Sequence, residues 1–92
     1  MKQNLVALVG TGTIAQGIAL TLARNALDVI IYDDSQAALD SALEGIAFSI
    51  DREIDKWGMT EGEKRSALSR IDTTTVKADL AQASVFFEAK GE

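Results

Sequence analysis

The stretch LVALVGTGTIAQGIAL, residues 5–20, decides the fold. A continuous apolar run, Leu5–Val9, leads into Gly10, and three of the chain's seven glycines lie close together at positions 10, 12 and 17. An uninterrupted apolar run of this length is typical of a strand buried on both faces in a parallel sheet. From Thr13 to about Asn25 the apolar residues recur every three or four positions, which predicts a helix. Two apolar stripes share this spacing: Ile14, Ile18 and Leu22, and Ala15, Ala19 and Ala23.

The rest of the chain alternates between helix and strand signals. Further strands are expected at Val29–Tyr32, Asp72–Val76 and Val85–Ala89. Between them the pattern predicts three helical segments. The first is long: Asp34 or Ser35 caps it, an apolar stripe runs from Leu39 to Trp57, and Gly58 ends it. The second opens with the capping box Thr60–Glu63 and ends near Arg70, and the third is a single turn at Asp79–Ala83. This order predicts an α/β fold of parallel strands in one domain, residues 1–92.

The composition excludes several classes of function. The 92 residues carry a net charge of −5 and contain neither cysteine nor histidine. An acidic surface repels nucleic acid, and without cysteine there is no disulfide or thiolate chemistry. Without histidine the commonest general base and metal ligand is absent, so no metal site is expected. The apolar runs are too short for a signal peptide or a membrane span, which favours a cytoplasmic protein without a membrane partner.

The glycines lie where a phosphate-binding turn needs them. Residues 10–15 read G-x-G-x-x-A between a predicted strand and a predicted helix. Gly10 would let the chain bend sharply, Gly12 would let a diphosphate approach the backbone, and Ala15 would let the helix pack close to the strand. Amides at the start of the helix would hold the phosphates. We expect Gly17 to serve the same close packing one turn later. The alternative interpretation is a tight turn that binds nothing.

Asp33 strengthens the nucleotide hypothesis. It ends the second predicted strand, 21 residues after Gly12, where such folds place an acidic group that binds a ribose diol. The alternative role for Asp33 is a helix cap, which Asp34 or Ser35 could supply instead. No lysine or arginine lies between Asp33 and Arg52, so a 2′-phosphate would find no partner there and NAD is favoured over NADP.

Other candidate groups have ordinary structural interpretations. The hydroxyls of Thr73–Thr75 could reach a ligand, but a strand edge is the simpler interpretation. Glu88 and Glu92 could form a carboxylate pair, yet the sequence shows no partner for them.

Several stretches resemble one family: VALVGTGTIAQGIA, VIIYDDSQAAL, RIDTTT, ASVFFEAKGE and the capping box after KWGM. They are similar to the N-terminal part of the 3-hydroxyacyl-CoA dehydrogenases, with the bacterial 3-hydroxybutyryl-CoA dehydrogenases as the nearest variety. The resemblance runs from Lys2 to Glu92. It implies a partial Rossmann fold, with a parallel sheet of about four strands in the order 3-2-1-4 and a long helical hairpin between strands 2 and 3.

The resemblance also implies a cofactor and a reaction. The family transfers hydride between 3-hydroxyacyl-CoA and NAD, which are the partners expected for the parent protein. Carried over by position, the NAD-binding residues are Gly10, Gly12, Thr13, Ile14 and Ala15 at the pyrophosphate, Asp33 at the adenosine ribose, and Ala89 and Glu92 toward the nicotinamide side. The family's catalytic histidine and its partners lie beyond Glu92, so no residue here is expected to be catalytic.

Two departures from the family bear on the chain's behaviour. Ala26 stands where the family has glycine, which would cost about 1 kcal/mol if the position is left-handed, unless Asn25 takes the turn instead. The sequence ends before the domain is complete, so we expect this portion alone to be inactive, to bind NAD weakly and to form homo-oligomers through the exposed edge of the fourth strand. A stand-alone NAD-responsive module, a half-domain completed by a partner chain and a half-domain without a ligand remain alternatives.

Overall fold

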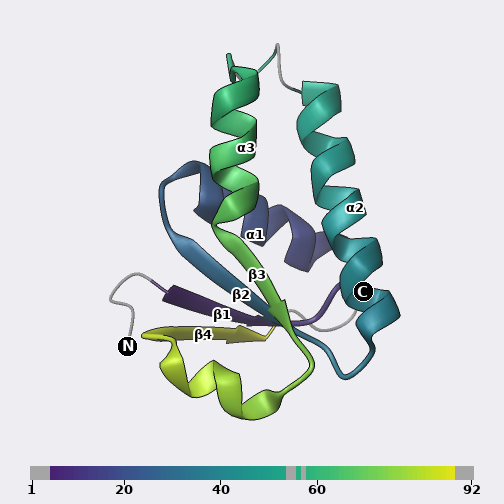
Figure 1. Ribbon diagram of the computed structural model, residues 1–92, viewed down its shortest axis with the longest axis vertical. Helices are drawn as coiled ribbons and strands as arrows, with labels where there is room; N and C mark the ends of the chain where they lie inside the picture. The colour runs from purple at the N-terminus through teal and green to yellow at the C-terminus, as the bar shows by residue number, and fades with distance from the viewer. Residues whose placement is uncertain (1–4, 54–55, 57, 89–92) are drawn as a thin grey trace.

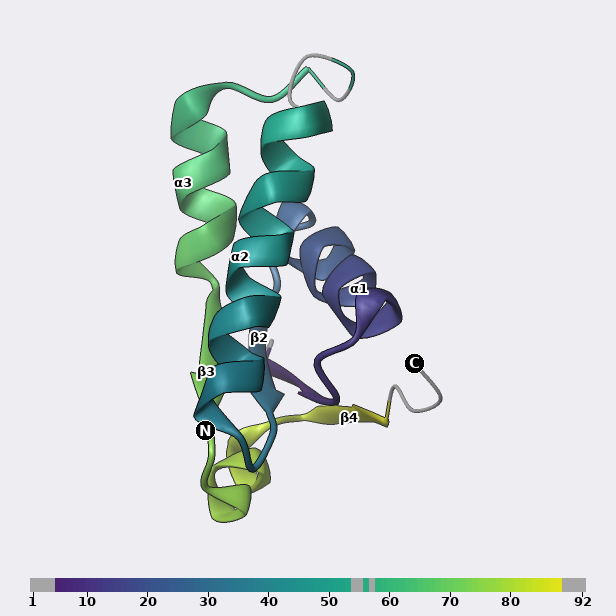
Figure 2. The same ribbon diagram turned by 90° about the vertical axis from the view of Figure 1, so that its right-hand side faces the viewer.

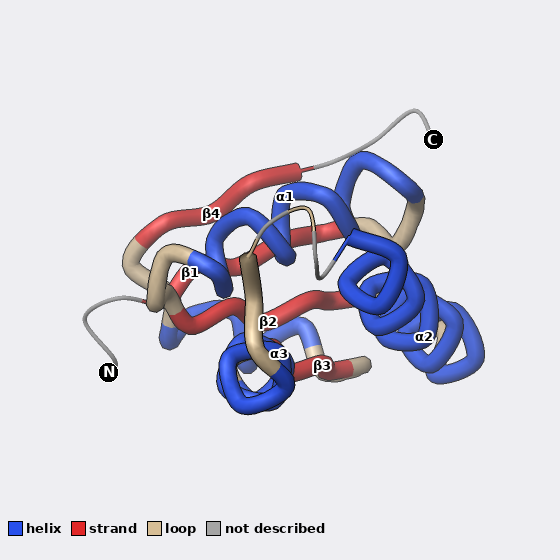
Figure 3. The backbone as a smooth tube through the Cα atoms, turned by 90° about the horizontal axis from the view of Figure 1, so that it is seen from above, coloured by secondary structure: helices blue, strands red, loops and turns tan. Residues whose placement is uncertain are grey.

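Four parallel strands form one sheet in the computed structural model, which describes residues 5–53, 56 and 58–88. The strands are β1 (Leu5–Val9), β2 (Asp28–Tyr32), β3 (Ile71–Thr74) and β4 (Val85–Glu88). Their order in the sheet is β3-β2-β1-β4, which Figure 3 shows from above. The register places Val6 of β1 between Val29 of β2 and Val85 of β4. The predicted parallel sheet and its strand order are confirmed.

Three α-helices and one 3-10 helix connect the strands (Figure 1). They are α1 (Thr13–Arg24), α2 (Gln36–Glu53), α3 (Glu61–Ser69) and the 3-10 helix η1 (Lys77–Gln82). The α-helices lie together on one side of the sheet, and η1 lies on the other (Figure 2). This is the arrangement of a Rossmann-type half, with the predicted helical hairpin, α2 and α3, between the second and third strands.

The alanine stripe of α1 faces the sheet. Ala15, Ala19 and Ala23 are fully buried, whereas Ile14 is 57% exposed. Small side chains let the helix axis approach the strands closely, and the larger residues Ile18 and Leu22 lie at the margin of the core. The packing therefore selects one of the two stripes that share the helical spacing.

The hairpin of α2 and α3 completes the main core. Leu39, Ile46 and Ile50 of α2 are fully buried, as their spacing predicts, whereas Ile54 and Trp57 lie outside the described residues. The expected stop at Gly58 is wrong: α2 is described to Glu53 and Lys56 already lies in a turn, while Gly58, with a positive φ of 68°, belongs to the turn before α3. A surface ion pair between Lys64 and Asp51 joins the two helices. Its hydrogen bond raises the pKa of the Lys64 ammonium.

The start of α3 has both hydrogen bonds of a capping box. The Thr60 hydroxyl accepts from the Glu63 amide at 3.1 Å, and the Glu63 carboxylate accepts from the Thr60 amide at 2.9 Å. Two amides that the helix itself cannot satisfy are thereby paired. The capping box predicted from the sequence is confirmed.

A smaller core covers the opposite face of the sheet. It joins Leu5, Ala7 and Ile30 of the strands to Leu80 of η1. Two expected ranges in this region are wrong: β3 spans Ile71–Thr74 rather than Asp72–Val76, and the helical turn spans Lys77–Gln82 rather than Asp79–Ala83.

Thr74 is the reason that β3 ends early. Its hydroxyl accepts from the Val76 amide at 3.0 Å and donates to Asp79 at 2.6 Å, so the chain turns out of the sheet. The fourth strand agrees with the expected Val85–Ala89 up to Glu88, since Ala89 lies outside the described residues. Within the described part of the chain, no helix has the length and apolar character to cross a membrane.

Candidate cofactor site

The glycine turn and Asp33 meet at the carboxyl edge of the sheet. The Gly10 amide donates to the Tyr32 carbonyl at 3.2 Å, which ties the end of β1 to the end of β2. The Asp33 amide donates to the Thr74 carbonyl at 3.3 Å, which ties β2 to β3. Ligands of open parallel sheets bind at this edge, so the predicted residues lie where a dinucleotide site is expected.

The backbone of the turn has the form that a bound diphosphate requires. Gly10 has φ 128°, a region that L side chains rarely adopt. Gly12 is the N-cap of α1 and has no side chain to fill the space above the helix end. The Gln16 amide donates to the carbonyl of Gly12 at 3.0 Å, so the helix begins directly at this turn. Such a terminus favours an anion.

Asp33 points toward the turn rather than into solvent. Its Oδ2 atom accepts from the Thr11 hydroxyl at 3.3 Å, and its Oδ1 atom accepts from the Ser35 amide at 2.9 Å. The helix cap is supplied by Ser35, whose Oγ accepts from the Ala38 amide at 3.2 Å. Asp33 is therefore available for a ligand while Ser35 starts α2.

The carboxylate of Asp33 keeps capacity for a sugar. An ionised carboxylate offers about four acceptor positions, and two of them are used here. The two hydroxyls of a ribose diol match the remainder. Together with the side-chain-free bend at Gly12, this geometry fits an adenosine diphosphate moiety such as the one in NAD.

The remaining site predictions have different outcomes. Ala15 is fully buried against the sheet, while the side chain of Ile14 is mostly exposed, so only its backbone could face a phosphate. Ala89 and Glu92 lie outside the described residues. The expectation for Gly17 is wrong: a Cβ built there meets nothing within 4 Å, because the residue lies on the exposed side of α1.

Two side-chain contacts of the turn escaped the sequence analysis. The Gln16 amide group donates to the Thr11 carbonyl at 3.0 Å. Its side chain lies against Gly45 of α2, where a Cβ would come within 2.3 Å of the Gln16 Oε1 atom. No sequence signal could reveal this fit, since the two residues belong to different helices and neither matches a motif.

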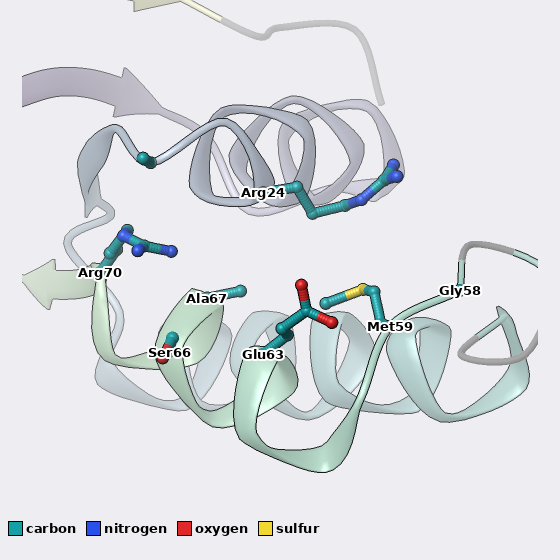
Figure 4. A pocket seen from close by; sticks show the side chains of 8 residues that line it. Arg24, Gly58, Met59, Glu63, Ser66, Ala67 and Arg70 are labelled. Atoms are coloured by element: carbon teal, nitrogen blue, oxygen red, sulfur yellow. The ribbon is translucent and has the colours of Figure 1, made fainter.

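A separate cavity of about 330 Å³ lies near the amino ends of β2 and β3. Figure 4 shows Glu63 of α3, Met59 from the segment before that helix and Arg70, which directly follows it, around this cavity. Arg70 donates to the Ala23 carbonyl at 3.0 Å and so satisfies the end of α1. This cavity is at the opposite edge from the glycine turn and does not belong to the cofactor site.

Comparison with known proteins agrees with the geometry. The family model "3-hydroxyacyl-CoA dehydrogenase, NAD binding domain" matches residues 5–92. A 3-hydroxyadipyl-CoA dehydrogenase of Escherichia coli is 32% identical over 95% of this chain and 18% of its own length. A 3-hydroxybutyryl-CoA dehydrogenase of Bradyrhizobium diazoefficiens is 33% identical over 95% of this chain and 30% of its own length.

Solved structures show the same relationship. The (S)-3-hydroxybutyryl-CoA dehydrogenase of Ralstonia eutropha superposes with a TM-score of 0.91 at 38% identity, covering 99% of this chain and 32% of that one. The chain thus spans less than a third of the length of these relatives. The chain belongs to the 3-hydroxyacyl-CoA dehydrogenase family: it matches the family's NAD-binding domain and covers only the N-terminal portion of these relatives.

Proposed function

We propose that the carboxyl edge of the sheet binds the adenosine diphosphate half of NAD. Gly10 and Gly12 shape the turn, the amides of Thr13 and Ile14 hold the diphosphate, and Ala15 seats the helix against the sheet. Asp33 accepts hydrogen bonds from the adenosine ribose. Ala89 and Glu92 would line the nicotinamide side. The observation that carries the proposal is the Asp33 carboxylate, held 3.3 Å from the hydroxyl of the glycine turn.

The reaction proposed for the whole protein is the oxidation of a 3-hydroxyacyl-CoA to the 3-oxoacyl-CoA, or the reverse reduction of the 3-oxoacyl-CoA. When bound, NAD accepts or returns the hydride at its nicotinamide ring. The contribution of this chain is to bind and orient the cofactor at the ends of β1 and β2. The substrate class rests on the relatives, whose names describe dehydrogenases of 3-hydroxyacyl-CoA thioesters.

The 92 residues by themselves are proposed to be inactive. They contain no histidine, so no imidazole can take the proton that leaves the 3-hydroxyl group. An assay of 3-hydroxybutyryl-CoA oxidation, followed by NADH absorbance, should show no turnover above the uncatalysed rate. Turnover by the purified chain would contradict this.

Binding is tested by calorimetric titration with NAD, NADP and ADP. Asp33→Asn removes the charge but keeps an oxygen that can accept from the Ser35 amide. We expect NAD affinity to fall roughly tenfold or more, because a hydrogen bond to a charged group is lost. The preference for NAD over NADP should narrow, since the carboxylate no longer repels a 2′-phosphate.

Asp34→Asn is the matched control, because it removes the same charge from the exposed neighbouring residue. Asp34→Asn should leave the affinities for NAD and for NADP within about twofold of those of the unsubstituted chain, as expected for a surface substitution. Equal losses in the two variants would show a general charge effect and reject the assigned role of Asp33. Absence of NAD binding by the unsubstituted chain would reject the cofactor site.

A second proposal concerns association. On the outer edge of the sheet, Val85, Phe86 and Phe87 are 46–52% exposed. A flat apolar edge strand is a template for pairing with another strand. We therefore propose a homo-oligomer through β4, with completion of the half-domain by a different chain as the alternative. The acidic, cysteine-free composition supports a cytoplasmic location without nucleic acid or membrane partners.

A further inference from the structure

Thr11 links the two halves of the candidate site. It lies between the two glycines of the turn and is half-buried. Its hydroxyl donates to the Asp33 Oδ2 atom at 3.3 Å, and its carbonyl accepts from the Gln16 side chain at 3.0 Å. One residue thus contacts both the carboxylate at the end of β2 and the first helix.

The contact fixes the direction of the carboxylate. Asp33 has a second donor, the Ser35 amide, on its Oδ1 atom at 2.9 Å. With one donor on each oxygen, the plane of the carboxylate is set from both sides. Without the Thr11 hydroxyl, only the bond to Ser35 would remain, and the Oδ2 atom would be free to turn toward water.

The side chain of Gln16 holds the turn that contains Thr11. Gln16 reaches its carbonyl from one turn into α1, and Gly45 of α2 leaves the space in which the Gln16 side chain lies. A Cβ at position 45 would approach the Gln16 Cδ atom to 3.0 Å. The Thr11 carbonyl is therefore held by a side chain that itself lies against α2, which restricts the position of Thr11 and its hydroxyl.

We propose that Thr11 is a positioning residue for cofactor recognition: its hydroxyl orients the Asp33 carboxylate toward the ribose diol. This inference rests on the proposed NAD site. Thr11, which lies between the two glycines of the turn, supplies a side-chain hydrogen bond that a glycine cannot make. Thr11 acts through Asp33 and does not itself hold the cofactor.

The test compares ADP with 2′-deoxy-ADP, measured by calorimetry on the full chain. The two probes share the diphosphate and adenine and differ only in the 2′-hydroxyl that Asp33 would recognise. Thr11→Val keeps the side-chain shape and removes the hydroxyl, whereas Thr11→Ser keeps the hydroxyl. We expect Thr11→Val to weaken ADP about three- to tenfold, the range for one hydrogen bond, and to leave 2′-deoxy-ADP nearly unchanged.

Further variants separate positioning from damage to the turn. Thr11→Ser should retain the preference for ADP, and Thr11→Ala, a second variant without the hydroxyl, should lose it as Thr11→Val does. In an Asp33→Asn background the Thr11→Val change should have little further effect on the ratio of the two affinities. Circular dichroism shows which variants are folded and can be compared.

Each outcome has a distinct meaning. If the unsubstituted chain binds ADP no better than 2′-deoxy-ADP, the proposed role of Asp33 fails and the inference fails with it. If it prefers ADP and Thr11→Val keeps that preference, the inference alone is overturned. Equal loss of affinity for both probes in Thr11→Val would show a merely structural role and would also overturn it.

Discussion

At the scale of single residues, Ala26 occupies a conformation that its side chain disfavours. Its φ is 66°, whereas the preceding Asn25 has φ −97°. The Leu27 amide donates to the Leu22 carbonyl and the Ala26 amide to the Ala23 carbonyl, both at 3.1 Å. These two bonds form a Schellman motif, which places a left-handed residue directly after the helix cap. Ala26, not Asn25, therefore takes the left-handed turn.

Replacing Ala26 with glycine should stabilise the chain. The left-handed region costs a residue with a Cβ about 1–2 kcal/mol, and glycine loses part of that gain through its freer unfolded state. We expect the free energy of unfolding to rise by about 1 kcal/mol, measured by urea denaturation. Ala37→Gly in α2, an exposed helical position, should lower it instead. Similar destabilisation by both changes would contradict the strain at Ala26.

At the scale of elements, each helix has its own termination chemistry. Ser35 caps the start of α2, and Thr60 and Glu63 cap the start of α3. Arg70, 47 positions away in the sequence, donates a hydrogen bond to the Ala23 carbonyl in the last turn of α1. In Figure 1 the lower ends of α2 and α3 lie next to the sheet, and the far end of this hairpin extends beyond the strands. We therefore expect local capping to contribute more to the stability of α3 than to that of α1, because α1 lies along the sheet.

The capping box gives the element-scale prediction. Thr60→Ala removes the oxygen that accepts from the Glu63 amide and should lower the free energy of unfolding by about 1 kcal/mol. Thr60→Ser retains that oxygen and serves as the control, with a change within about 0.5 kcal/mol. Both are read by chemical denaturation, and amide exchange of residues 61–64 should rise only in the alanine variant. Unchanged exchange there would show that the box does not hold the helix start.

At the scale of the whole molecule, the sheet is covered unequally. Among the residues that the structure describes, three helices cover one face and one 3-10 helix covers part of the other, and β4 forms one edge of the sheet. The strand's large side chains stay about half exposed although β1, its neighbour, is almost entirely buried. Buried apolar surface stabilises a fold roughly in proportion to its area, so covering β4 would be favourable.

Association through this edge should be sensitive to charge. A lysine on an edge strand opposes pairing with a second strand. We expect sedimentation of the unsubstituted chain to show dimers or larger species as concentration rises, and Phe86→Lys to shift them toward monomers. Val76→Lys is the matched control, since Val76 is similarly exposed at 54% but lies outside the strand. A monomer at every concentration, or equal effects of both lysines, would contradict pairing through β4.

Local patterns were sufficient for much of this molecule. The strands, the glycine turn, the capping box and the placement of Asp33 follow from residues that act on their immediate neighbours. A continuous apolar run is typical of a buried strand. A threonine three residues before a glutamate forms a capping box, in which each side chain accepts a hydrogen bond from the backbone amide of the other residue. The family pattern supplied the strand order, which the structure confirms.

Only the tertiary structure decided the contacts between distant residues. The sequence alone determined that α1 is amphipathic, but packing against the sheet selected its alanine stripe and left Gly17 on the exposed side. The Thr11–Asp33 contact spans 22 positions, and the fit of Gln16 against Gly45 joins two helices. Such contacts depend on how separate elements are placed in space, and residue spacing along the chain carries no record of that placement.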